Sequence, residues 1–373
     1  MDRRNKIGQR WLELFDWPLF LLTITLALLG VVVIYSATFA SEGETMRKLY
    51  LKQLEWNLYG LIILMIMSLL DYRLVERPAY LLWGICVVLL IAVLVGGKVI
   101  SGSKRWLGFG GMNFQPSEVM KLVLIITLTK YFNNLRDLSE EMGFKRLIIP
   151  AVLTLIPAAL IAKQPDLGTA VVLVAIFFAM AFVNGVKKKT LLSVIVGLLV
   201  LVPVMWTHMK DYQKNRVLAV VNPSSDPLGT GYHTIQSKIA IGSGGFFGKG
   251  LFRGTQSKLN FLPEKHTDFI FAVFAEEIGF VGVFLLLLLY LSLVLRMIDI
   301  VVKAKDRIGA LMAAGVSAMF AFHFLYNISM TIGLTPIVGI PLPLFSYGGS
   351  SLLTNYAAIG LLISIRARRF RHD

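Results

Sequence analysis

The sequence of 373 residues contains one cysteine and few acidic side chains. Cys86 stands alone, so the chain cannot form an internal disulfide and cannot build a zinc site from several cysteines. His233 and His266 lack the spacing of metal ligands, and no metal site is predicted. No GxxxxGK[ST] pattern occurs, which argues against a nucleoside triphosphate site of the P-loop type. Asp and Glu total 22 against 37 Lys and Arg, for a net charge of +15.

Apolar residues make up 56% of the chain, and the mean hydropathy is +0.71. Runs of about 18 or more apolar residues predict transmembrane helices. We therefore predict an all-α polytopic membrane protein, with one membrane domain spanning 1–373. Its ten transmembrane helices are expected at about 17–40, 49–70, 79–95, 116–133, 147–163, 167–184, 190–208, 268–296, 308–333 and 351–366. The first run is too long for a signal-peptide core, so we expect it to be retained.

The positive charge is distributed along the chain in a way that predicts topology. If the N-terminus is inside, the inside segments hold far more Lys and Arg than the short outside loops. Both termini are then cytoplasmic, and the long loop 209–267 is extracytoplasmic. This distribution accounts for the basic charge without a nucleic-acid partner. The basic tail after 365 is expected to contact anionic membrane lipids.

The long outer loop 209–267 is rich in glycine and punctuated by basic residues. Around Ser243, Gly244 and Gly245, backbone N–H groups could converge on an anion, with Lys249 nearby. Arg105 in the loop 97–115 is a second candidate cation for a phosphate.

Asp268 stands where this loop meets the next apolar helix. Thr267 before it is a candidate N-cap. The helix dipole would stabilise the Asp268 carboxylate, whereas burial would destabilise it, so the sign of its pKa shift is open. Such a carboxylate could take a proton from a hydroxyl nucleophile. The alternative is an aspartate that only caps the helix.

Glu118 and Lys121 lie three residues apart near the start of the predicted helix 116–133, on one helical face. Ionisable residues at membrane depth are costly and are candidates for function, although a structural ion pair is the alternative. Further polar candidates gather at the predicted outer helix ends: Gln164, Asp166, His266, Thr267, Glu276 and Ser346.

Several long motifs resemble the SEDS family (shape, elongation, division and sporulation), and its elongation branch more than its division branch. The resemblance covers about residues 15–367. The motifs are KRWLGFG at 104–110, FQPSEVMK at 114–121, KQPDLGTA at 163–170, NPSSDPLGTGYHTIQSKIAIGSGG at 222–245, LPEKHTDFIFAVFAEE at 262–277 and PLPLFSYGGSS at 341–351.

The resemblance implies a peptidoglycan glycosyltransferase that polymerises lipid II on the outer face of the bacterial cytoplasmic membrane. It implies Asp268 as the essential aspartate, Glu118 and Lys121 as its conserved helix pair, and Arg105 with Trp106 as the outer-loop pair. The implied substrates are lipid II and a glycan linked to undecaprenyl pyrophosphate. The implied partners are a class B penicillin-binding protein, which is a transpeptidase, and other elongation-complex proteins.

Three other functions stay open on the sequence. A lipid II flippase would place ionisable groups along a path through the bilayer, whereas here they gather at the outer side. A scaffold for the penicillin-binding protein would tolerate loss of Asp268. A glycosidase would need two facing carboxylates at a set separation. No cofactor is predicted, although a divalent cation (Mg²⁺ or Mn²⁺) could accompany the pyrophosphate.

Overall fold

The computed structural model of the chain is mostly helical. It describes residues 13–39, 43–100, 103–109, 112–135, 144–187, 211–223, 229–259 and 261–369 except 263. Between 188 and 210 it describes residues 189, 190, 192, 193, 196, 197, 200, 203, 206, 207 and 209. The predicted helix 190–208 therefore lies largely outside the described residues, but those described between 189 and 207 are helical.

The long helices coincide with segments predicted to cross a membrane. They are α2 (Trp17–Phe39), α4 (Leu49–Leu69), α6 (Ala79–Gly96), α7 (Pro116–Asn134), α8 (Ile148–Lys163), α9 (Leu167–Val183), α14 (Ile270–Val302), α15 (Arg307–Thr331) and α16 (Gly349–Ala367). Among the described residues, five helical segments are long and apolar enough to span a bilayer: α2, α6, α14, α15 and the stretch Phe144–Lys163. Several apolar helices in one chain make this a multi-pass membrane protein.

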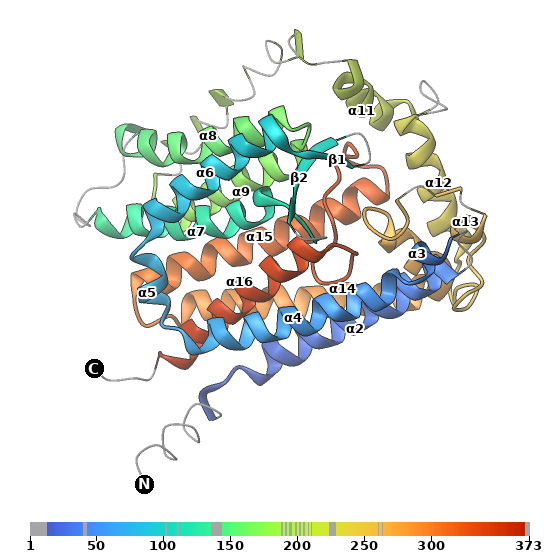
Figure 1. Ribbon diagram of the computed structural model, residues 1–373, viewed down its shortest axis with the longest axis horizontal. Coiled ribbons are helices and arrows are strands. Elements are labelled where there is room, and N and C mark those ends of the chain that lie inside the picture. The colour runs from blue at the N-terminus through green and yellow to red at the C-terminus, as the bar shows by residue number, and fades with distance from the viewer. Residues whose placement is uncertain are drawn as a thin grey trace.

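Shorter elements lie at the two ends of the helix bundle. α5 (Tyr72–Glu76) lies at the same end as the start of α2 and the end of α16. α3 (Glu44–Arg47), α12 (Thr230–Ser243) and α13 (Thr255–Lys258) lie at the opposite end (Figure 1). α11 (Asp211–Val221) precedes α12, and the 3₁₀ turn η1 (Phe144–Leu147) leads into α8. The described part of the predicted loop 209–267 thus contains three helices.

A small sheet corrects the prediction of an all-α chain. β1 (Lys98–Ile100), β2 (Ser103–Phe109) and β3 (Met112–Phe114) form an antiparallel sheet in the order β1-β2-β3. Strands this short, in a glycine-rich stretch, leave no clear two-residue alternation in the sequence. Lys104 fastens the sheet by donating to the carbonyls of Leu94 and Val95 at the end of α6, over 3.0 and 2.7 Å. The sheet therefore holds Arg105 and Trp106 in fixed positions.

Local signals set several helix starts. Pro116 occupies the first turn of α7, as the sequence predicted, because proline there loses no hydrogen bond. Asp166 caps α9 by accepting from the Thr169 N–H at 3.2 Å. Asp306 caps α15 in the same way through the Gly309 N–H at 2.8 Å.

Glycines let α4 and α16 approach closely. A Cβ at Gly60 would lie 2.1 Å from the ring of Tyr356, and one at Gly360 would lie 2.5 Å from the Leu64 carbonyl oxygen. In membranes such small residues allow the dense contacts that hold helices together. The outward faces carry exposed apolar side chains, such as Val95 at 79% exposure, as expected for contact with lipid.

α14 is broken near its start, at Gly279, and a glycine-rich loop fills the break. Gly279 adopts φ 76° and ψ −168°, so its neighbours cannot complete the helical hydrogen bonds. The freed carbonyls of Glu276 and Glu277 accept from the N–H groups of Lys249 and Gly250 at 3.0 and 2.8 Å. In return, the N–H groups of Phe280 and Val281 donate to the carbonyls of residues 245 and 246 at 2.9 and 3.2 Å. Four backbone groups that the break leaves without a helical partner are thereby paired with the loop.

Candidate functional site

A cavity of about 690 Å³ brings together seven of the fifteen predicted site residues, Asp268 among them. Its walls come from α4, β2, the start of α7, the turn before α9, the turn before α14 and the loop after α15. The lining residues include Arg105, Trp106, Glu118, Asp166, His266, Thr267 and Asp268. Segments far apart in sequence thus converge on one polar space.

Asp268 lies in the turn that precedes α14, not in the helix itself. The helix begins at Ile270 with Phe269 in the N-cap position, and no side chain caps it. The expectation that Thr267 caps this helix is therefore wrong: its hydroxyl instead donates to the Glu264 carbonyl and carboxylate at 3.3 and 3.2 Å. Only Phe269 separates Asp268 from the helix, and Asp268 lines the cavity.

The backbone of Asp268 is held from α15. The Asn327 side-chain amide, fully buried, donates to the carbonyls of Asp268 at 3.0 Å and Ile340 at 2.7 Å. Gly339 lies beneath the carboxylate with φ 74°, and a Cβ there would be 3.4 Å from Asp268 Oδ2. Asn327 therefore ties the aspartate turn to the loop after α15.

The loop 341–348 supports the same turn from the other side. The Tyr347 N–H donates to the His266 carbonyl at 2.9 Å, and the Ser346 hydroxyl donates to the Thr267 carbonyl at 2.7 Å. Ser346 also accepts from the Leu342 N–H at 2.9 Å. Ser346, a predicted site residue, does not line the cavity but positions the turn that carries Asp268.

The environment of Asp268 raises its pKa to about 7. Burial is the main cause because it disfavours the charged carboxylate. Negative charge on Glu264 and Asp166 adds to the rise, while Arg105 and Arg216 oppose it. The pKa of His266 is lowered, mainly by burial. A carboxyl group with a pKa near neutrality can accept and return a proton under physiological conditions.

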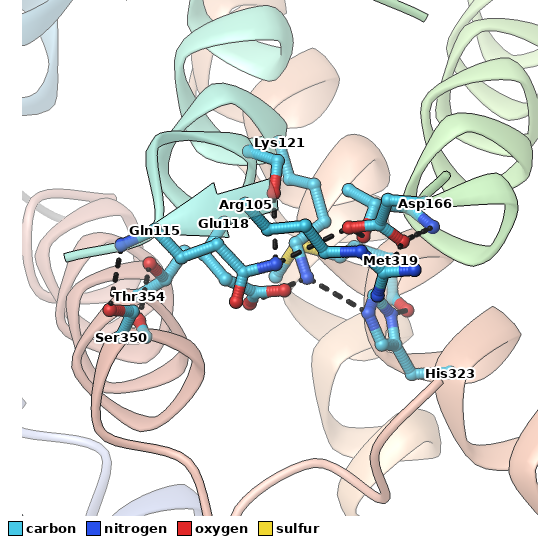
Figure 2. Close-up of polar contacts among 11 residues, drawn as sticks. Arg105, Gln115, Glu118, Lys121, Asp166, Met319, His323, Ser350 and Thr354 are labelled. Atoms are coloured by element: carbon cyan, nitrogen blue, oxygen red, sulfur yellow. Dashed lines mark hydrogen bonds and ion pairs between the residues drawn. The ribbon is translucent and has the colours of Figure 1, made fainter. Parts of the chain in front are cut away.

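Asp166 and Arg105 form a second polar group beside the cavity (Figure 2). Arg105 Nη1 lies 3.8 Å from Asp166 Oδ1, and the guanidinium also donates to the carbonyls of Gln164, over 3.3 Å, and Pro165. Gln115 donates to Asp166 Oδ2 at 3.3 Å. The Gln164 amide is buried and donates to a carbonyl of α6, Leu90 O, at 2.9 Å. Arg105 is therefore held in place by the turn before α9 while it lines the cavity.

Glu118 and Lys121 form the buried ion pair that their spacing predicted, with a third member that the sequence analysis missed. Lys121 Nζ lies 2.8 Å from Glu118 Oε2 and 3.0 Å from His323 Nε2 (Figure 2). His323 Nδ1 lies 2.7 Å from the Met319 carbonyl, so Nδ1 carries the proton and Nε2 accepts from Lys121. Of these three residues only Glu118 lines the cavity. Lys121 binds Glu118, and His323 binds Lys121.

The structure does not bring the glycine-loop candidates into the cavity. Ser243, Gly244 and Gly245 lie against α14, where a Cβ at Gly244 would be 2.1 Å from the Ala275 carbonyl oxygen. The N–H of Lys249 is used at the helix break, and its ammonium lies 2.7 Å from Glu276 Oε1. These glycines allow close backbone contact with α14, rather than an open ring of N–H groups.

Glu276 is buried at the break and does not line the cavity. Its Oε1 accepts from the backbone N–H and the hydroxyl of Thr255 at 2.7 and 2.8 Å, and from the Gln256 N–H at 3.1 Å. Glu277 beside it accepts from the Ser36 hydroxyl of α2 at 2.6 Å. The two glutamates therefore join the segment 255–256, α14 and α2.

Several residues at the site were not identified from sequence, among them Gln115, His323 and Asn327. His323 and Asn327 lie four residues apart inside an apolar helix, and polar residues at membrane depth are a recognised signal of function or packing. That signal was available in the sequence. Among the described residues, no group of three or more His, Cys, Asp or Glu side chains is arranged to hold a metal ion.

Comparison with known proteins places the chain in a family. The model of the FtsW/RodA/SpoVE family, described as cell cycle proteins, matches residues 16–370. The peptidoglycan glycosyltransferase MrdB of Escherichia coli K12 is 41% identical over 95% of this chain and 94% of its own length. The peptidoglycan glycosyltransferase RodA of Treponema pallidum is 36% identical over 95% of this chain and 98% of its own length.

Solved structures agree with this match. A chain of a peptidoglycan synthase complex that coordinates polymerization and crosslinking is 35% identical, with a TM-score of 0.81 over 96% of this chain and 99% of that one. The rod shape determining protein RodA of Thermus thermophilus is 31% identical, with a TM-score of 0.71 over 96% and 98%. The chain belongs to the FtsW/RodA/SpoVE family, also called the SEDS family. Within it, the relatives and structures fit the RodA type.

Proposed function

We propose that this chain polymerises lipid II into β-1,4-linked glycan strands on the outer face of the cytoplasmic membrane, with Asp268 as the general base. Peptidoglycan glycosyltransferase activity follows from family membership and from relatives named for it across nearly the whole chain. The observation that carries the role of Asp268 is its carboxyl group, in a polar cavity, with a pKa of about 7.

The reaction needs one base and one displacement. The 4-hydroxyl oxygen of the acceptor GlcNAc attacks the anomeric carbon of the donor MurNAc, and the bond from that carbon to the pyrophosphate oxygen breaks. The hydroxyl proton passes to the Asp268 carboxylate, and undecaprenyl pyrophosphate leaves with its bonding electron pair. A single displacement inverts the α-linked donor to a β-linked product.

Arg105 is the cation proposed to stabilise the leaving pyrophosphate. It lines the cavity and is fixed by Asp166 and two backbone carbonyls, so it needs no reorganisation during the reaction. Trp106 lines the same wall and would contact the substrate beside it. Lys249 is already bound to Glu276, so it supports this role less well. A divalent cation that accompanies the pyrophosphate stays a prediction from the sequence.

The proposed orientation places the cavity outside the cytoplasm. The start of α2 and the end of α16 lie at one end of the bundle, where the positive-inside rule puts the cytoplasm, and α12 and α13 lie at the other (Figure 1). A class B penicillin-binding protein is the proposed partner, because the structurally similar synthase complex couples polymerization to crosslinking.

The test uses purified full-length protein in lipid vesicles, with and without a class B penicillin-binding protein. Fluorescent lipid II is supplied, and glycan products are resolved on a gel. Asp268→Asn, which keeps the side-chain shape, should yield no strands while still binding lipid II. Strands of normal length and amount from Asp268→Asn would refute the assignment. Transfer of lipid II across vesicles by wild-type protein, without polymer under either condition, would favour a flippase instead.

A further inference from the structure

The outer half of α4 is unusually polar for a helix in a membrane protein. α4 has 21 residues but is not among the five described segments apolar enough to span a bilayer, and its outer turns contain Lys52 and Glu55. Ionisable residues at such positions are costly unless they face protein or a polar cavity. Lys52 and Glu55 are therefore expected to contact protein or to face a polar cavity.

One face of α4 looks into the cavity. Lys52, Glu55, Trp56 and Tyr59 all line it, and their spacing of three, four and seven residues places them on one side of the helix. Lys52 is exposed. Among the residues that the structure describes, no hydrogen bond or ion pair engages its ammonium group. Arg105, which also lines the cavity, differs because it is bound to Asp166.

The neighbouring face of α4 is anchored, so the cavity face is rigid. Gln53, fully buried, donates to the Ser346 carbonyl at 3.2 Å. Asn57 accepts from the Tyr356 hydroxyl of α16 at 2.7 Å. Through Ser346, this anchor also reaches the turn that carries Asp268.

Trp56 forms a fixed aromatic surface in this wall. Its indole packs directly on Gly349, where an added Cβ would lie 2.5 Å from indole Cε2. The ring of Tyr59 meets it edge-on, with centroids 6.0 Å apart and planes at 72°. The apolar C–H face of a sugar ring packs well against such a surface, because the contact removes apolar area of both groups from water.

We propose that Lys52 and Trp56 form a second substrate subsite, distinct from the subsite of Arg105 and Trp106. Lys52 would bind a pyrophosphate, Trp56 would pack against the adjoining sugar, and Glu55 would accept hydrogen bonds from sugar hydroxyls. This inference rests on the proposed function: polymerisation requires two lipid-linked sugars at once, and both carry a pyrophosphate. Two such anions in one cavity require positive charge on more than one wall.

The test measures steady-state kinetics of the full-length protein with its penicillin-binding partner, in vesicles. The variants are Lys52→Ala, Lys52→Arg and Trp56→Phe. The matched control is Lys48→Ala, one turn earlier on the chain, where the lysine is paired with Glu44 and is not among the residues that line the cavity. Undecaprenyl pyrophosphate, which has no sugar, serves as a competitive probe.

Lys52→Ala should raise the KM for lipid II and the inhibition constant of undecaprenyl pyrophosphate by about tenfold or more, as expected for loss of a charge-assisted hydrogen bond. Lys52→Arg should restore most of both, and Lys48→Ala should change neither. Trp56→Phe should raise the KM for lipid II without changing inhibition by undecaprenyl pyrophosphate. Thermal melting confirms that each variant is folded.

Three results separate the failure of this inference from failure of the proposed function. If wild-type protein forms strands but folded Lys52→Ala keeps wild-type constants for both ligands, the α4 subsite is refuted and the polymerase role stands. If Lys52→Ala lowers kcat alone, with both constants unchanged, Lys52 does not bind substrate and the subsite is also refuted. If wild-type protein forms no strands, the proposed function itself fails.

Discussion

The pKa of Asp268 makes a prediction about the pH dependence of catalysis. Its rise from the usual 3.8 to about 7 corresponds to about 4 kcal/mol in favour of the protonated carboxyl group. A base must be ionised to accept a proton, so activity should fall as pH falls through the folded-state pKa. One pH unit below that value, roughly a tenth of the protein carries the carboxylate.

The assay is kcat/KM for lipid II between pH 5 and 9, since this ratio reports the ionisation of the free enzyme. We expect a plateau above pH 8 and a fall of about tenfold per unit below pH 7. Inhibitor binding at each pH and thermal melting show whether the loss reflects chemistry or unfolding.

Two neighbouring charges should shift the acidic limb of this pH profile, the fall in kcat/KM below pH 7, in opposite directions. Glu264 raises the pKa of Asp268, so Glu264→Gln should shift the limb to lower pH. Arg105 lowers it, so Arg105→Gln should shift the limb to higher pH, in addition to weakening binding. Glu44→Gln, on an exposed residue paired with Lys48, is the control and should leave the limb in place. An apparent pKa near 4 for the fall in kcat/KM, or one that Glu264→Gln leaves unchanged, would refute the reasoning.

Three further predictions concern the folded stability of variants at Asp268, Lys121 and Gly248. Because the pKa of Asp268 is raised on folding, its stabilising contribution is present at low pH and lost as pH rises through about 7. Asp268→Asn should therefore melt at a higher temperature than wild type at pH 8, and the difference in melting temperature should narrow by pH 5.5. A lower melting temperature than wild type at pH 8 would contradict this. Lys121→Met leaves Glu118 buried without its cation, which typically costs about 3–5 kcal/mol, so the melting temperature should fall clearly, whereas an unchanged melt would show that the pair is dispensable. Gly248→Ala should destabilise the inserted loop 245–250, because its Cβ would lie 2.2 Å from the Glu277 carbonyl oxygen at a φ of +78°. Limited proteolysis should cut this loop faster in the variant than in wild type. Equal rates would refute the tight contact.

Local helix signals in the sequence agree with the structure where chemistry acts within a few residues. Pro116 at a helix start and the spacing of Glu118 and Lys121 on one helical face both depend on local geometry. The end of the helix predicted at 268–296 differs, because α14 continues to Val302. Arg296, the last residue of the predicted range, binds Asp16 just before α2 at 3.0 Å, and the helix continues past it.

Residues whose roles depend on distant partners were not predictable in the same way. The glycines at 244–250 suggested an anion site, since an open glycine loop is one way to expose N–H groups. Their partner is the break at Gly279, which appears in the sequence only as one glycine within an apolar run. Asn327 and His323 act through contacts to turns and helices far along the chain, so their polarity was visible but their partners were not.

The break in α14 explains how a long membrane helix can place a carboxylate accurately. The segment 270–278 is short and almost wholly buried, and its last residues are bound by the inserted loop 245–250. At its other end, Asn327 and the loop 341–348 hold the turn that carries Asp268. Asp268 therefore depends on a short segment fixed at both ends, and motion of the remaining helix can be absorbed at Gly279. Ser36 of α2 donates to Glu277 of this segment at 2.6 Å and accepts from the Phe252 N–H, just after the inserted loop, at 2.9 Å, so α2 is tied to both parts.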